Sequence, residues 1–272
     1  MRIAIPLFDG ITALDAVGPY EVLSRLPGAE IRFVAAEPGP KRTETGMLSL
    51  IADAALTDLP DPEVVVVPGG FGTRALMENH TLLDWLRAVH ETSEWTTSVC
   101  TGSLLLAAAG ILGGMEATTH WLELDTLERY GAHPVTRRVV ERGKVITAAG
   151  VSSGIDMALT LAARLAGEHV AQAIQLSIEY DPEPPFDTGS PATLLQRSSS
   201  WCEAQQAGSL TSVDVQPQTV AADRRGDSER SGRKPTQRLD NRVAKDRVAG
   251  LTTRASRSVA QTVPLVAPCG SE

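Results

Sequence analysis

One cysteine occupies a position that is typical of a nucleophile. Cys100 lies in the segment 99–103, VCTGS, between a β-type run and a stretch of small, helix-forming residues. A tight strand-to-helix turn lifts its side chain clear of the sheet. The free N–H groups at the start of the helix favour a thiolate. We therefore predict a reachable Cys100 with a lowered pKa. The alternative is a buried structural cysteine, although the turn, the glycine and the polar Thr101 would fill a core poorly.

A glycine-rich segment follows another strand-like run. The segment 68–72, PGGFG, comes directly after EVVVV at 63–67. Three glycines in four residues let the backbone N–H groups of Gly69 and Gly70 approach a ligand or an anionic intermediate. Ligands of open α/β sheets bind at the carboxyl ends of the strands, so we expect this segment near Cys100. Alone, it is equally compatible with an ordinary turn.

Two further side chains could exchange protons with the thiol. Asp15, in LDAVGP at 14–19, either caps the following helix or points into the site, where a nearby thiolate would raise its pKa. His120, in TTHW at 118–121, is either a partner base for Cys100 or a capping or surface residue. The other histidines lack metal-ligand spacing, and neither a P-loop nor a G-x-G-x-x-G after a strand is present. We expect neither a metal nor an organic cofactor.

Strands alternate with helices along the first 180 residues. The pattern predicts strands at 2–8, 30–36, 63–67, 95–99, 117–119, 135–141 and 144–148, and helices at 16–26, 81–92, 102–110, 122–130, 153–166 and 168–180. The run at 63–67 is apolar and β-branched, as in a strand with both faces covered. The alternation predicts an α/β fold, a mainly parallel sheet with helices on both faces.

The composition changes after residue 193. Residues 197–272 are rich in Ser, Arg, Gln, Thr and Ala and show no sustained hydrophobic period. We predict a folded domain at 1–195 and a low-complexity, disordered tail at 196–272. The tail holds 12 of the 25 Lys and Arg but 8 of the 33 Asp and Glu, which leaves the domain with an excess of 12 negative charges. We expect no specific nucleic-acid partner for so acidic a domain.

The cysteine count and the apolar runs predict a cytoplasmic protein. Three cysteines are too few and too scattered for a disulfide framework or a cysteine-based zinc site. Asp9 interrupts the first apolar run before a signal-peptide core could form. The most apolar stretch, 104–112, is far shorter than the ~20 residues of a membrane span. In a reducing compartment a lone thiol stays reduced.

Five segments together resemble one known group. SVCTGS at 98–103 and ATTHW at 117–121 resemble the DJ-1/PfpI superfamily of class I glutamine amidotransferase-like folds. Within it, LDAVGP at 14–19, PGGFG at 68–72 and EYDPEPPFDTGSP at 179–191 resemble the isonitrile hydratase branch. The resemblance covers residues 1 to about 193. The cysteine turn is widespread in the superfamily, whereas the segments at 14–19 and 179–191 are more specific.

The resemblance implies a homodimeric, flavodoxin-like three-layer sandwich that acts on a small molecule without a cofactor. By similarity, Cys100 would be the nucleophile, Asp15 its acidic partner, Thr101 a residue that orients the intermediate, and Gly70 a backbone N–H donor. The peptidase-like relatives carry His where this chain has Thr101, which argues against peptidase or amidotransferase chemistry. Near residue 192 the relatives continue into a short closing helix, whereas this chain enters its biased tail.

The implied reaction is the hydration of an isonitrile to an N-substituted formamide, with protonated Asp15 as the acid and the Cys100 thiolate as the attacking group. Two alternatives stay open. One is a non-catalytic small-molecule sensing domain, as found in AraC-type regulators, although the tail lacks the helical pattern of a downstream DNA reader. The other is a redox or carbonyl-stress protein of the DJ-1 type, in which an accessible thiol oxidises or attacks aldehydes.

Overall fold

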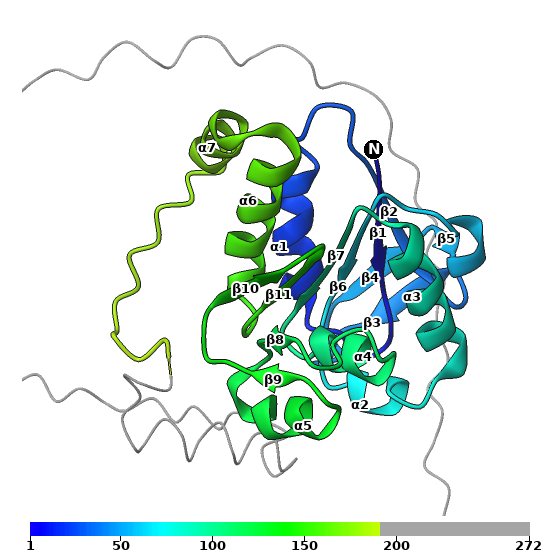
Figure 1. The fold of residues 1–272 in the computed structure, drawn as a ribbon. Coiled ribbons are helices and arrows are strands. Elements are labelled where there is room, and N and C mark those ends of the chain that lie inside the picture. Colours follow the sequence, from blue (N-terminus) through cyan, green and yellow to red (C-terminus); the bar gives the residue numbers. More distant parts are fainter. Residues whose placement is uncertain (191–272) are drawn as a thin grey trace, which may run out of the picture. The chain divides into compact units, whose positions relative to one another are not determined.

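A computed structural model describes residues 1–190 of the chain, and these build a three-layer α/β sandwich (Figure 1). Seven strands form the central sheet in the order β10-β11-β7-β6-β1-β2-β5, and every neighbouring pair is parallel except β10 with β11. The expected flavodoxin-like architecture with a mainly parallel sheet is confirmed. The predicted domain boundary near 195 and the predicted disordered tail lie outside the described residues.

The strands of the sheet are short, and the inner ones are apolar. All four valines of β6 are buried, as the β-branched run predicted for a strand covered on both faces. The bounds of the sheet strands are β1 Arg2–Pro6, β2 Glu30–Ala35, β5 Ala54–Ala55, β6 Val64–Val67, β7 Trp95–Val99, β10 Val139–Arg142 and β11 Val145–Ala148. Two small pairs lie outside the sheet: β3 Gly39–Arg42 with β4 Ser49–Ala52, and β8 Glu116–Ala117 with β9 His133–Pro134.

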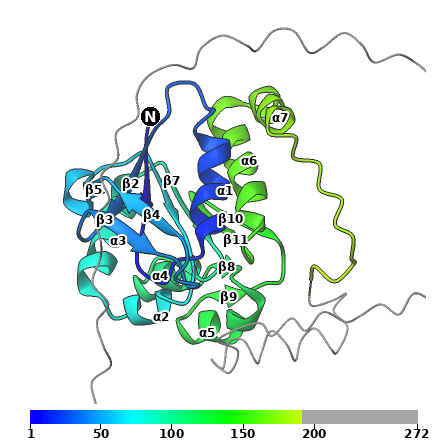
Figure 2. The same cartoon turned by 180° about the vertical axis from the view of Figure 1, so that it is seen from behind.

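Helices cover both faces of the sheet. Helices α1 and α6 pack together on one face, and α3 and α4 lie on the other, as the front and rear views show (Figures 1 and 2). The helical bounds are α1 Ala13–Leu23, α2 Thr73–Leu76, α3 His80–Thr92, α4 Gly102–Ala108, α5 Leu124–Arg129, α6 Ser153–Ala166 and α7 Glu168–Ser177, with 3-10 turns η1 Leu56–Asp58 and η2 Trp121–Glu123.

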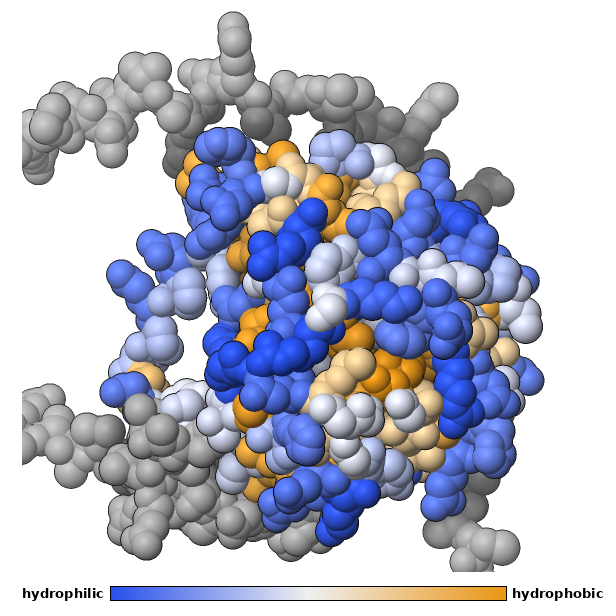
Figure 3. Space-filling view, viewed as in Figure 1, coloured by the Kyte–Doolittle hydropathy of each residue, from blue (hydrophilic) through white to orange (hydrophobic). Residues whose placement is uncertain are grey.

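Helix α3 shows how sequence pattern becomes packing. Leu82, Leu83, Leu86 and Val89 form its buried stripe, and its other positions are mostly polar and exposed. On the face of the molecule drawn in Figure 3, hydrophilic residues surround patches of apolar ones.

Three details differ from the predicted elements. Helix α1 begins at Ala13 rather than at 16, so that Asp15 and Pro19 lie inside it. Only the last part of the expected strand at 135–141 forms a strand, as the beginning of β10, and residues 135–138 are not in a strand. The β3–β4 hairpin, β5 and α2 were not expected, because these elements are only two to four residues long and too short to show a hydrophobic period.

Candidate functional site

Cys100 sits in a strained turn between β7 and α4. Its φ is +56°, in the left-handed region that residues with a Cβ rarely adopt. The backbone N–H of Cys100 donates to the carbonyl oxygens of Ala148 and Ala149, at 3.1 and 2.9 Å, which holds the turn. Gly102 must be glycine, since a Cβ there would lie 2.1 Å from the carbonyl oxygen of Val67. The predicted strand–turn–helix geometry around the cysteine is therefore present.

The state of the thiol differs from the expectation. Only 4% of Cys100 is exposed, and this burial raises the pKa of its thiol, with the negative charge of Asp15 adding to the effect. Backbone N–H groups of Val151 and Thr101 oppose the rise but do not outweigh it. The prediction that the helix start keeps this sulfur ionised is wrong for this arrangement, because desolvation exceeds what the seven-residue helix α4 and its N–H groups supply.

Asp15 lies beside the thiol rather than capping a helix. Thr12 precedes the first residue of α1, and Asp15 is fully buried in the first turn of that helix. Its Oδ2 accepts the N–H of Gly69 at 2.9 Å. Its Oδ1 has no hydrogen-bond partner of standard geometry among the described residues, and the Cys100 thiol is the other group that stabilises the carboxylate. Of the two readings of Asp15, the structure favours a side chain that points into the site.

The carboxyl group of Asp15 titrates near neutrality. Burial raises its pKa to about 7, the N–H of Gly69 opposes that rise, and the negative charge of Glu44 adds to it. Asp15 and Cys100 thus form a coupled pair. At least one proton is bound to the pair at neutral pH.

The glycine segment after β6 holds two side chains in place. The N–H of Gly69 is bonded to Asp15, and the N–H of Gly70 donates to Oγ1 of Thr101 at 2.9 Å. A Cβ at Gly69 would lie 2.5 Å from the backbone nitrogen of Thr101, so only glycine fits. The expectation that these two N–H groups face a ligand is not met, because site side chains already occupy them. Their role in this structure is to position Asp15 and Thr101.

His120 lines the site as a neutral ring. It precedes η2, and its Nδ1 accepts the N–H of Leu122 at a long 3.4 Å. Burial lowers the pKa of its imidazole, with the nearby Arg74 contributing in the same direction. An accepting Nδ1 implies that the proton of the neutral ring is on Nε2. His120 therefore caps a short 3-10 turn, as one of its two expected roles requires, and it lines the same cavity as Cys100.

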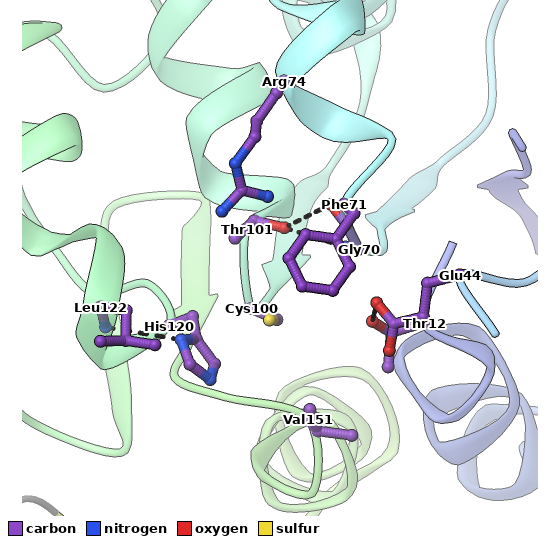
Figure 4. Close-up of a pocket in the computed structure, with 10 residues that line it drawn as sticks. All are labelled: Thr12, Glu44, Gly70, Phe71, Arg74, Cys100, Thr101, His120, Leu122 and Val151. Carbon is purple, nitrogen blue, oxygen red and sulfur yellow. Dashed lines mark hydrogen bonds between the residues drawn. The ribbon is translucent and has the colours of Figure 1, made fainter. Parts of the chain in front are cut away.

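The predicted residues meet in one cavity of about 220 Å³ (Figure 4). Cys100, Thr101, Gly70 and His120 line it, and Asp15 lies beneath them. Sequence reasoning missed six lining residues: Thr12, Glu44, Phe71, Arg74, Leu122 and Val151.

Some of these missed residues carried a readable signal. Val151 lies shortly after the end of β11, and Cys100 directly follows β7. Because ligands bind at the carboxyl ends of the strands, this position could have indicated Val151. Phe71 lies inside the glycine segment itself. Glu44 could not be found, because it sits on the unexpected β3–β4 hairpin.

The rim of the cavity carries charge of both signs. Cζ of Arg74 lies 5.1 Å from the centroid of the Phe71 ring. Arg74 also forms an ion pair with Glu123, which reduces the net positive charge at this side of the rim. On the other side, Oγ1 of Thr12 donates to Glu44 at 3.0 Å. Among residues 1–190, no group of three or more His, Cys, Asp or Glu comes together as a metal site, and no helix is long and apolar enough to cross a membrane.

The fold agrees with the comparisons to known proteins. Residues 1–164 match the model of the DJ-1/PfpI family, and the chain belongs to this family. It is similar to the isonitrile hydratase of Pseudomonas putida, with 46% identity over 193 residues, 71% of this chain and 84% of that enzyme.

Two other comparisons bear on the function. The HTH-type transcriptional regulator CdhR of Pseudomonas aeruginosa is 33% identical over 65% of this chain, which spans about half (52%) of the regulator. Among solved structures, a THiJ/PfpI family protein from Pseudomonas syringae superimposes with a TM-score of 0.72 and 36% identity, covering 77% of this chain and 87% of that one.

Proposed function

We propose that this chain is an isonitrile hydratase-like enzyme, which adds water to R–N≡C and gives an N-substituted formamide. One observation carries the proposal: Asp15 and Cys100 share a buried site at the floor of a small cavity, and the pKa of Asp15 is raised to about 7. Such a pair supplies a nucleophile and a proton at one point. The similarity to the Pseudomonas putida isonitrile hydratase supports this choice of reaction.

The first step adds the Cys100 S–H across the isocyano carbon. The sulfur forms a bond to that carbon as Asp15 relays the thiol proton to the same carbon, which gives the thioimidate R–N=CH–S–Cys100. Only one proton on the pair is needed, and it can start on either group. This relay replaces the free thiolate expected from the sequence, because burial keeps the thiol protonated until the carboxylate accepts its proton.

The second step consumes one water molecule. Water adds to the C=N carbon, and its proton passes to nitrogen. The resulting R–NH–CH(OH)–S–Cys100 then breaks its C–S bond, releases R–NH–CHO and regenerates the thiol with the hydroxyl proton. We propose that Thr101 and His120, which both line the cavity, hold this water. The protein residues alone account for both steps, and we propose no cofactor.

We further propose that the enzyme is a cytoplasmic homodimer with a small-molecule substrate. Met47, Leu48 and Ile51 of the β3–β4 hairpin region are 87%, 50% and 65% exposed. Exposed apolar residues grouped in this way mark association surfaces. Light scattering on the purified chain tests the dimer, and a monomeric mass at micromolar concentration would contradict it.

The second candidate function is a sensing domain without catalysis. It is favoured by the similarity to CdhR, whose matched part is about half of that regulator. A redox or carbonyl-stress role of the DJ-1 type is the other alternative, and it needs only an oxidisable or aldehyde-reactive Cys100. All three functions would use the same cavity, so binding of a ligand there cannot distinguish them. The product that forms from each substrate can.

The deciding experiment incubates the full chain with ethyl isonitrile and follows the formation of N-ethylformamide. We expect turnover by the wild type and none above background by Cys100→Ala. Formamide formation that persists in Cys100→Ala would sink the mechanism. Binding of the isonitrile without turnover would support the sensor. Conversion of a glyoxal, or mild peroxide oxidation of Cys100 to the sulfinate, in the absence of any formamide would support the DJ-1-type role.

A further inference from the structure

A second cavity adjoins the one that contains Cys100. Its volume is about 360 Å³, against about 220 Å³ for the first. The two cavities share only His120 and Val151 among the described residues that line them. The imidazole ring and the valine therefore form the wall between the two spaces, and Figure 4 shows both side chains next to Cys100.

The ring of His120 is held on several sides. Its Nδ1 accepts the N–H of Leu122, and the ring of Trp121 lies 6.0 Å from it, centroid to centroid. On another side it packs against Gly150, where an added Cβ would lie only 2.9 Å from Cδ2 of the imidazole. A ring held in this way forms a fixed wall, because it has little space in which to rotate.

The described residues that line the second cavity are mostly uncharged. Hydroxyl-bearing and apolar side chains predominate on it: Thr118, Thr119, Thr136, Ser152, Trp121 and Leu124. Among the described residues that line it, Arg138 carries the one formal charge; Arg138 is ion-paired with Asp156 and also donates to Oγ of Ser152 at 3.2 Å. Such a lining suits an uncharged organic chain better than an anion or a cation.

We propose that His120 determines the length of the substrate's N-substituent. With the isocyano carbon at Cys100, a short substituent fits in the first cavity, and a longer one meets the imidazole wall. Removal of the ring joins the two cavities and admits extended, uncharged substituents. This inference rests on the proposed hydratase function for its substrate class, but the wall itself can be tested without it.

The first test uses alkylation of Cys100 and needs no turnover. Iodoacetamide and its N-hexyl derivative are reacted with the full chain at pH 8.5, and modification is followed by mass spectrometry on the peptide that contains Cys100. Cys202 and Cys269 then do not contribute. We expect the wild type to react with the long reagent more slowly by roughly tenfold or more, as expected for a hydrophobic site that rejects excess length. A wild type that reacts equally fast with both reagents would overturn the proposal without any variant.

Three variants separate ring size from other effects. His120→Ala should abolish most of the discrimination, whereas His120→Phe should retain it, because a ring still divides the cavities. His169→Ala, at an exposed position of α7, is the matched control and should behave as the wild type. A parallel loss of reactivity toward both reagents in His120→Ala, with the ratio unchanged, would contradict the proposal.

The second test measures hydration. The ratio of kcat/KM for n-hexyl isonitrile over ethyl isonitrile should rise by roughly tenfold in His120→Ala and stay near the wild-type value in His169→Ala. An unchanged ratio would also overturn the proposal. Absence of formamide from every variant would reject the hydratase function alone, since the alkylation ratios would still decide the role of His120.

Discussion

The two ends of strand β7 both bury polar side chains, but only one end satisfies them. At the start of β7, Oγ1 of Thr96 lies 2.8 Å from Nδ1 of His90 and 3.1 Å from Oγ of Ser93. Lys144 donates to the carbonyl oxygens of His90 and Ser93. At the other end, Oδ1 of Asp15 has no partner of standard geometry among the described residues.

The backbone shows the same contrast. Thr96 lies in regular strand, paired with Val145 and Val65, whereas Cys100 adopts a positive φ. Buried polar groups are nearly always hydrogen-bonded, so an unpaired one in a strained surrounding needs an explanation. We conclude that the start of β7 is built for stability and its end for chemistry. Measurements of activity and of unfolding can test this division separately.

The largest expected effect is on the pH dependence of turnover. In the proposed mechanism the active form carries one proton on the Asp15–Cys100 pair, and raising the pH through about 7 removes the second proton from Asp15. The kcat/KM for hydration should therefore rise about tenfold per pH unit well below 7, by roughly 50-fold between pH 5 and 7, and then level off. The measurement is a pH–rate profile with Cys100→Ala as the blank for acid hydrolysis.

The Asp15→Asn variant provides the control for this profile. Its residual activity should lack the rise near pH 7, because the titrating carboxyl group is gone. A rise that survives in Asp15→Asn would assign the titration to another group, and a flat wild-type profile would reject the one-proton mechanism.

A structural feature could be predicted from the sequence where residues close together in the chain determine it. Helix α6 and strand β7 were predicted to the residue, since amphipathic period and β-branched runs are local properties. The proximity of the glycine segment to Cys100 was also predicted, because parallel strands end at one edge of the sheet, whereas the local sequence left Asp15 open between a helix cap and a site residue. The family resemblance added the expected roles.

The electrostatic state of the site could not be predicted in the same way. The pKa of Cys100 depends on how many atoms cover the sulfur, and those atoms come from β11, α1 and the loop at Val151. The N–H of Gly69 is bonded to Asp15 of α1, which begins three residues before its predicted position, and the N–H of Gly70 is bonded to Thr101 at the start of α4. Both errors arise from tertiary contacts that no local pattern encodes.

The second expected effect concerns the stability cost of the unpaired carboxyl group. The pKa of Asp15 is raised from 3.8 in the unfolded reference to about 7, so the folded state holds its proton more tightly. This tighter proton binding stabilises the folded state fully below pH 3.8, and the stabilisation is lost as the pH rises through about 7. Asp15→Asn should therefore be more stable than the wild type at pH 8, by on the order of 3 kcal/mol.

Urea unfolding of both proteins at pH 4 and pH 8 measures this difference. The gain should shrink toward zero at pH 4, where the wild-type carboxyl group is protonated. An equal gain at both values of pH would show that packing, rather than the buried charge, distinguishes the two proteins.

The smallest expected effect lies at the start of β7. Thr96→Val preserves the shape of the side chain but leaves Nδ1 of His90 and Oγ of Ser93 without their shared hydroxyl partner. Loss of a buried partner costs about 1–3 kcal/mol, and the higher β propensity of valine offsets a small part of it. Urea unfolding at pH 8 should show that destabilisation, while kcat/KM for the isonitrile stays at the wild-type value. If Thr96→Val instead lowered turnover at unchanged stability, the two ends of β7 would be coupled, and the division between a structural end and a chemical end would have to be abandoned.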